Sequence, residues 1–122
     1  MVRGVVSRGV GIMWIAHSVG GGGWISIVAH KNKPNHLMVR ARVKDHITKM
    51  WPNAEVYTLH GIHDYQFRAD LPRETVALAL SEYASSIEYD DYKSSVSDSD
   101  LYRALVSTWW VFVKYFGRGP SE

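Results

Sequence analysis

A short segment in the middle of the chain brings two imidazoles and a carboxylate together. His60, His63 and Asp64 lie close along the sequence, and histidine nitrogens and carboxylate oxygens are the ligands that zinc and similar ions accept. A small metal-dependent enzyme could be built on such a turn. Three ligands this close seldom all point at one ion, and no HExxH spacing supplies a helical pair. We therefore treat His60, His63 and Asp64 as weak metal candidates and expect no catalytic residues and no cofactor.

A second group of residues could bind phosphate. Between positions 31 and 49 the cationic side chains greatly outnumber the acids, of which Asp45 is the one example. Such clusters attract the phosphates of nucleic acids. Arg68, on the outward side of a predicted strand, is added to this cluster. The basic set therefore comprises Lys31, Lys33, Arg40, Arg42, Lys44, Lys49 and Arg68. The formal net charge is only +2, and no aromatic side chain is expected on the outward side of the sheet. Nucleic-acid binding is therefore the alternative function.

A third group could bind another protein. Residues 101–116 carry two adjacent apolar stripes at helical spacing, which is more apolar surface than packing on one sheet requires. Trp109 and Trp110 are consecutive and cannot both face one core, and tryptophan is a common interface anchor. The expected interface residues are Tyr102, Val106, Trp109, Trp110 and Val113. The competing interpretation is that this helix is buried between the sheet and the N-terminal segment.

Composition excludes several classes of protein. The chain has 122 residues, 46% of them hydrophobic, and no cysteine, so disulfides and thiolate metal sites are excluded. No apolar run approaches the roughly 18 residues needed to span a bilayer. Gly20–Gly23 is not followed by the Lys-Ser or Lys-Thr of a phosphate-binding loop. These features are typical of a globular domain without a membrane span, and they leave its compartment undetermined.

The elements that must position these residues follow from periodicity. Residues 24–29 are apolar and β-branched, which predicts a strand. Val39, Val43, Ile47 and Met50 recur at helical spacing and predict a first helix over residues 35–50. Residues 54–59 and 64–71 alternate and predict an antiparallel hairpin. Helical spacing returns at residues 73–87. Residues 89–96 are either a short edge strand or irregular, and Ser97 is the expected cap of a third helix.

This order predicts an α+β fold with a three- to four-stranded sheet and helices on one face. Strand 24–29, helix 35–50 and strand 54–59 would form a right-handed parallel crossover. The arrangement would be ferredoxin-like or a truncated ferredoxin-like variant, of order β-α-β-β-α-(β)-α. Residues 24–116 are expected to be the single globular domain, and residues 117–122 a disordered tail.

Residues 1–23 have a different composition, rich in glycine and aliphatic side chains. Three explanations are compatible with this composition: a secretory signal, a start codon assigned upstream of Met13, and an extra edge strand over residues 12–19. Because four consecutive glycines give the backbone great freedom, the expectation is a loosely attached, flexible extension.

Four separated blocks of the chain resemble a family of small uncharacterised proteins from actinobacteria and their bacteriophages. The blocks cover residues 36–42, 64–69, 71–76 and 89–98, and end in Trp109 and Trp110. The resemblance implies a stand-alone small domain that works inside a bacterial cell, and it assigns no activity and no functional residues. The leading hypothesis is a non-enzymatic interaction module that binds a protein partner or itself, as a dimer, through the Trp-rich helix. For a phage-encoded protein, it would modulate a host factor.

Overall fold

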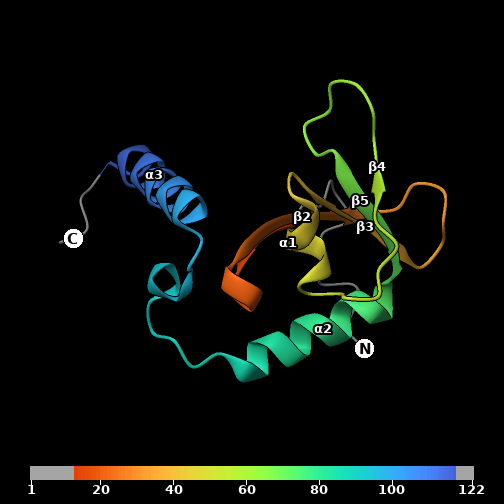
Figure 1. The fold of residues 1–122 in the computed structure, drawn as a ribbon, viewed down its shortest axis with the longest axis horizontal. Helices are drawn as coiled ribbons and strands as arrows, with labels where there is room; N and C mark the ends of the chain where they lie inside the picture. The colour runs from red at the N-terminus through yellow and green to blue at the C-terminus, as the bar shows by residue number, and fades with distance from the viewer. Residues whose placement is uncertain (1–12, 118–122) are drawn as a thin grey trace.

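A five-stranded sheet is the centre of the computed structural model, which describes residues 13–117 (Figure 1). All its strand pairs are antiparallel, in the order β1-β2-β3-β5-β4. The strands are β1 (Met13–His17), β2 (Gly23–Ala29), β3 (His36–Ala41), β4 (Tyr57–Thr58) and β5 (Phe67–Pro72). The helices are α1 (Lys44–Thr48), α2 (Arg73–Ser86) and α3 (Ser99–Tyr115), with 3₁₀ turns η1 (Val19–Gly21) and η2 (Tyr92–Ser95).

Alternation along the strands gives the sheet an inner and an outer face. On the inner face Ile27, Val39 and Ala69 form one row across β2, β3 and β5, and all three are buried. Burying this apolar surface is the main favourable term in forming the sheet. The buried cluster on the inner face comprises Ile25, Ile27, Val39, Ala41, Ile47, Trp51, Ala69, Leu71 and Val76. It joins the sheet to α1 and α2, because Ile47 and Val76 come from those helices.

The helix expected over residues 35–50 was wrong in its first half. Residues 36–41 form β3, and α1 is a short helix from Lys44 to Thr48. Val39 and Ile47 are buried as expected, but Val43 is exposed, because no continuous helix aligns the three residues. The parallel crossover therefore does not form, and the ferredoxin-like arrangement is not confirmed.

Other elements agree with expectation. Strand β2, helix α2 and helix α3 lie where periodicity placed them, and β4 pairs with β5 in an antiparallel hairpin. The α+β class is confirmed, although the sheet is larger than expected. Residues 89–96 contain η2 and no strand. The cap of α3 is Asp98, which accepts hydrogen bonds from the main-chain N–H groups of Asp100 and Leu101, and not the expected Ser97.

The segment before β2 is ordered as a strand and a turn that lead into the sheet over residues 13–22. Met13–His17 is the edge strand β1, which pairs with β2 along its whole length, as in the extra-strand explanation. Gly20, Gly21 and Gly22 turn the chain with φ of 59°, 100° and 116°, values that side-chain-bearing residues rarely adopt. The expectation of a loose extension is thus corrected for these residues, because the glycines serve as a tight turn. Residues 1–12 and 118–122, including most of the expected tail, lie outside the described residues.

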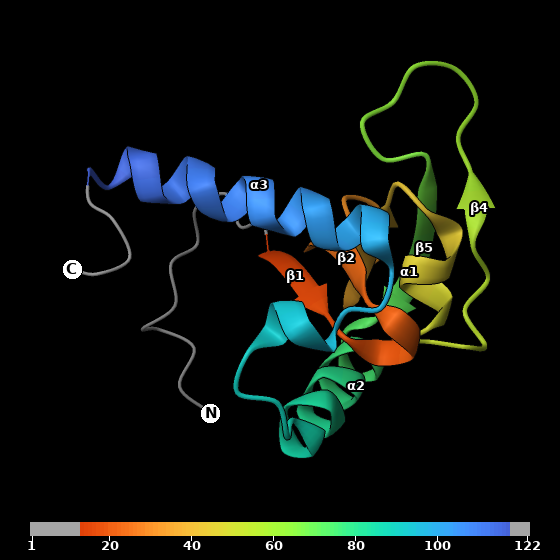
Figure 2. The same cartoon turned by 60° about the vertical axis from the view of Figure 1, so that its left-hand side comes forward.

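The sequence pattern predicts helices on one face of the sheet only. In the structure the three helices lie on both faces. Figure 2 shows α2 below the sheet and α3 above it, passing beside β1 and continuing beyond it. Near its beginning α3 approaches side chains of the outer face, among them Trp14 and Trp24. The inner face is therefore covered by α1 and α2, which contact β2, β3 and β5, whereas α3 approaches the outer face at β1 and β2.

Candidate functional site

A half-open pocket of about 310 Å³ lies between α3 and the outer face of the sheet. Its walls come from five parts of the chain, and most of its surface is apolar. The lining residues are Trp14, Trp24, Arg42, His46, Tyr65, Leu101, Ala104, Leu105 and Thr108. The rings of Trp14 and Trp24 contact each other with centroids 6.0 Å apart. An apolar, aromatic pocket with a few polar groups on its wall is a common form of binding site.

Beyond the pocket, α3 exposes large apolar side chains on several sides. Leu105 is buried against the sheet, but the last two turns of the helix turn their aromatic and aliphatic groups outward. The exposed members of this apolar end are Trp110, Val111, Phe112, Tyr115 and Phe116, and the exposed Met13 and Trp14 lie on β1. Of the five expected interface residues, Tyr102 and Trp110 are exposed, whereas Val106, Trp109 and Val113 are half-buried. The ring of Trp109 contacts that of Trp110, with centroids 4.8 Å apart.

Tyr65 gathers three arginines at the outer face. Its ring is buried and carries the guanidinium carbons of Arg40 and Arg42 at 4.8 and 4.5 Å from its centroid. Its main-chain oxygen accepts a hydrogen bond from Nε of Arg68 at 3.1 Å. Cation–π contacts of this kind stabilise a guanidinium over an aromatic ring. Arg40 and Arg42, expected on the helix over residues 35–50, and Arg68, expected on the strand over residues 64–71, are thus brought to one place by Tyr65.

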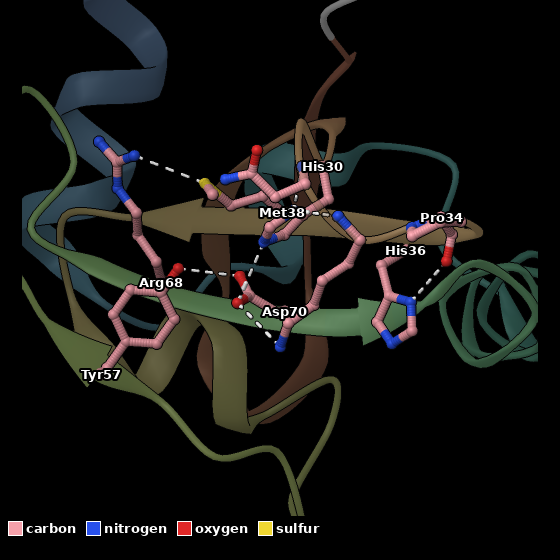
Figure 3. A network of polar contacts seen from close by, with 9 residues as sticks. His30, Pro34, His36, Met38, Tyr57, Arg68 and Asp70 are labelled. Carbon is pink, nitrogen blue, oxygen red and sulfur yellow. Dashed lines mark hydrogen bonds and ion pairs between the residues drawn. The ribbon is translucent and has the colours of Figure 1, made fainter.

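A polar network on the outer face centres on Asp70 (Figure 3). One carboxylate oxygen accepts from the Tyr57 hydroxyl at 2.8 Å, and the other lies 3.2 Å from Nε2 of His30 and 3.5 Å from Nζ of Lys33. Burial alone would raise the pKa of Asp70, but the hydrogen bonds from Tyr57 and His30 outweigh it and lower that pKa. Burial, with the bond to Asp70, raises the pKa of Tyr57 to about 12.

The His30–Asp70 pair resembles a catalytic dyad but is arranged for structure. Nδ1 of His30 accepts the main-chain N–H groups of Asn32 and Lys33, both at 3.0 Å. Its proton is therefore on Nε2, where it is donated to Asp70. Since neither ring nitrogen is free to accept a proton from a substrate, this histidine cannot serve as a general base in the geometry observed. The pair instead fixes the loop between β2 and β3.

The weak metal candidates do not converge. Nε2 of His63 is hydrogen-bonded to the main-chain oxygen of His60 at 3.0 Å, and Asp64 pairs with Nη2 of Arg42 at 2.8 Å. All three side chains are exposed in the loop between β4 and β5. Across residues 13–117 there is no group of three histidine or acidic side chains placed to hold a metal ion.

The basic set is split by the fold. Arg40, Arg42 and Arg68 meet at Tyr65, and Lys33 joins the outer face through Asp70. Lys31 is exposed in the loop between β2 and β3, and Lys44 is exposed at the start of α1. Lys49 lies at the far side of α1, where its Nζ donates to the main-chain oxygen of Gly22 at 3.0 Å. Four of the seven residues therefore share one surface.

Sequence reasoning missed the aromatic residues of this region. Trp14 belongs to a segment expected to be loose, and Trp24 and Tyr65 belong to the strands expected over residues 24–29 and 64–71, where no binding role is predicted for them. The signal for Trp14 was its place in the extra-strand explanation for residues 12–19. No sequence signal placed Tyr65 beneath two arginines, because that contact depends on how β3 pairs with β5.

Comparisons of the chain with protein-family models, with curated proteins and with solved structures find no match in any of the three. Within the part of the chain that the structure describes, no helix has both the length and the apolar character to cross a membrane. The function must therefore be argued from the residues themselves.

Proposed function

We propose that this protein is a non-enzymatic interaction module that binds a second copy of itself, or a partner protein with a similar apolar surface, through the end of α3 and the neighbouring β1. One observation carries the proposal: large apolar side chains are exposed together on this part of the molecule. Trp110 is 49% exposed, Phe116 67% and Trp14 58%. Contiguous apolar patches of this kind are rare on monomeric proteins and mark interaction sites.

The composition of the helix end supports an interface. Among residues 109–116 Lys114 is the single charged side chain, and the cores of protein interfaces are likewise poor in charge and rich in aromatic residues. The two tryptophans supply the kind of anchor that dominates binding energy in interfaces. The first half of α3, through Leu105, holds the helix on the sheet. The second half, which extends past β1 (Figure 2), exposes Trp110, Val111, Phe112, Tyr115 and Phe116.

The resemblance described above extends the proposal to a biological setting. If the protein belongs with the actinobacterial and phage family, it acts in the bacterial cytoplasm, and a phage-encoded copy would be an accessory protein that modulates a host factor. This part rests on the resemblance alone, because fold does not assign function.

Sedimentation of the full chain over a wide concentration range tests the self-association arm. The wild type is expected to form a dimer that dissociates on dilution. The charge-neutral double variant Val111→Lys and Phe112→Glu is expected to remain monomeric, because both side chains are exposed on α3. Leu78→Glu, an exposed apolar position on α2, is the matched control and should dimerise normally.

To test for a different partner, the wild type and the double variant are each isolated from the native cell, and the proteins that are isolated with them are compared. A partner that is lost from the double variant and kept by Leu78→Glu supports the proposal. A wild type that is monomeric at every concentration, with no partner that depends on Val111 and Phe112, would contradict it.

A further inference from the structure

Two arginines face each other in the middle of the outer face. Arg40 of β3 and Arg68 of β5 are direct register partners, and both point away from the buried core. Like charges placed opposite each other across two strands destabilise a sheet. Among the ion pairs of residues 13–117, none joins either guanidinium to a carboxylate. The pair therefore places two positive charges together without an internal anion.

The partners of these guanidinium groups are electrically neutral. Arg40 donates from Nη2 to the Ser26 hydroxyl at 2.7 Å, and its buried Nε has no hydrogen-bond partner in the described chain. Arg68 donates to the main-chain oxygen of Tyr65 and, at 3.4 Å, to the sulfur of Met38. A guanidinium gains most from a carboxylate or phosphate that accepts two of its N–H groups. Both arginines lack such an acceptor.

Nearby carboxylates are already engaged by other cations. Asp70 is held by His30, Lys33 and Tyr57 (Figure 3), and Asp64 is paired with Arg42. Neither is left to neutralise Arg40 or Arg68. With Lys33 and Arg42 included, four cationic side chains stand against two carboxylates on this face, so its potential is positive.

The cationic groups follow β3 from end to end. Lys33 precedes the strand, Arg40 lies near its end, and Arg42 follows it. A six-residue strand is about 20 Å long, which exceeds the reach of a single phosphate group. Tyr57, the register partner of Arg68, is 37% exposed beside the arginine pair. A basic sheet surface with an exposed aromatic ring suits a single nucleic-acid strand, whose phosphates bind the cations and whose bases stack.

We infer that the outer face of the sheet binds single-stranded nucleic acid, with phosphates at Lys33, Arg40, Arg42 and Arg68 and a base against Tyr57. This activity lies on a different surface from the apolar end of α3 and does not depend on the proposed function. It also differs from the original sequence hypothesis, because Lys31, Lys44 and Lys49 are not part of the surface and Tyr57 is.

Fluorescence anisotropy with labelled mixed-sequence RNA and DNA single strands tests the inference. The full chain is expected to bind at low salt, and log affinity should fall linearly with log salt concentration. Arg68→Gln should weaken binding about tenfold, the loss of one charge-assisted contact. Lys33→Gln, an exposed position that leaves the fold intact, should reduce the salt slope by about 0.7 for one phosphate contact. Arg68→Lys should retain most of the binding.

Controls separate this site from general charge effects. Arg103→Gln removes the same charge from an exposed position on α3, where Arg103 pairs with Asp100, and should leave binding unchanged. Tyr57→Ala should weaken binding to single strands more than binding to duplexes. The inference is overturned if neither strand binds at low salt, if Arg103→Gln weakens binding as much as Arg68→Gln, or if inorganic pyrophosphate binds as tightly as the oligonucleotide.

Discussion

His17 and His46 are joined through one hydrogen bond, from Nε2 of His17 to the main-chain oxygen of His46 at 3.0 Å. Nδ1 of His17 accepts the N–H of Val19, and Nδ1 of His46 accepts the N–H of Trp24, each at 3.2 Å. Both rings are therefore neutral with the proton on Nε2. A second proton on either Nδ1 would face a main-chain donor, so this link ties β1, β2 and α1 together only while the histidines are uncharged.

Acidification below neutrality is expected to destabilise the protein. Burial lowers the pKa of His17 and of His46 below the ordinary value of 6.5. The unfolded chain then takes up protons before the folded protein does, so stability is full above about pH 6.5 and is lost as the pH falls toward the lowered values. Histidine side chains change their charge between about pH 5 and 8. Thermal unfolding followed by circular dichroism at a series of pH values from about 7.5 to about 5 measures the loss of stability.

The histidine link can be tested with two substitutions. His17→Gln keeps a donor for the main-chain oxygen of His46 but cannot be protonated, so it should reduce the pH dependence to the part that His46 contributes. His36→Gln, at the start of β3, where the ring of His36 is bonded to the main-chain oxygen of Pro34, should preserve it. A pH profile that is unchanged in His17→Gln would show that the loss of stability has another source.

Gly23→Ala should destabilise the fold by about 1–3 kcal/mol, the usual cost of overpacking. A Cβ at Gly23 would lie 2.7 Å from Cε1 of His17 and 3.2 Å from Cα of His46. Urea unfolding measures the cost. In a His17→Ala background, Gly23→Ala should lower the free energy of unfolding much less, because the imidazole ring that the new Cβ contacts is absent. A double-mutant cycle detects this coupling between the two positions. Additive costs would argue against the close contact.

Tyr83→Phe should lower stability by about 1–2 kcal/mol, because it leaves a partly buried main-chain donor without its acceptor. The Tyr83 hydroxyl accepts the N–H of Ser18 at 3.0 Å and lies 2.8 Å from the hydroxyl of Tyr89. Tyr89→Phe removes only the second contact and should cost less. Chemical denaturation of both variants provides the comparison, and a Tyr89→Phe variant that is the less stable of the two would contradict it.

The cap of α3 gives a prediction on which the structure and the sequence pattern differ. Asp98→Ala should lower the melting temperature, because Asp98 accepts two main-chain N–H groups at the start of the helix. Ser97→Ala should have a smaller effect, since Ser97 is held through its own N–H, which donates to the main-chain oxygen of Gly21. Equal losses in the two variants would mean that the cap is shared.

The error at residues 36–41 has a physical origin. Val39, Val43, Ile47 and Met50 satisfy a helical period, but Leu37, Val39 and Ala41 also satisfy the two-residue period of a strand. Short segments of this kind are decided by the partners that they find. Here β3 pairs on both sides, with β2 and β5, and this long-range pairing outweighs the local helical pattern. Helix α2, which packs by one face, was predicted correctly from its own spacing.

The sites differ in how far sequence could anticipate them. The apolar surplus of α3 was visible because a helix displays its stripes without reference to other elements. The arginine pair was not visible in the sequence, because Arg40 and Arg68 become neighbours only through the register of β3 and β5. The predicted helix over residues 35–50 includes Arg40, and on a helix this residue would contact different neighbours. Whether α3 mediates binding stays a prediction.

The sheet order has a consequence for how the chain folds. Strands β1, β2 and β3 follow one another in sequence, so each pairs with its predecessor after a short loop. The β3–β5 pair, by contrast, must close residues 42–66, which include α1 and β4. Closing a longer loop costs more chain entropy, and non-local contacts slow folding. The first three strands can therefore assemble early, whereas the step that brings Arg40 beside Arg68 is the one expected to limit the rate.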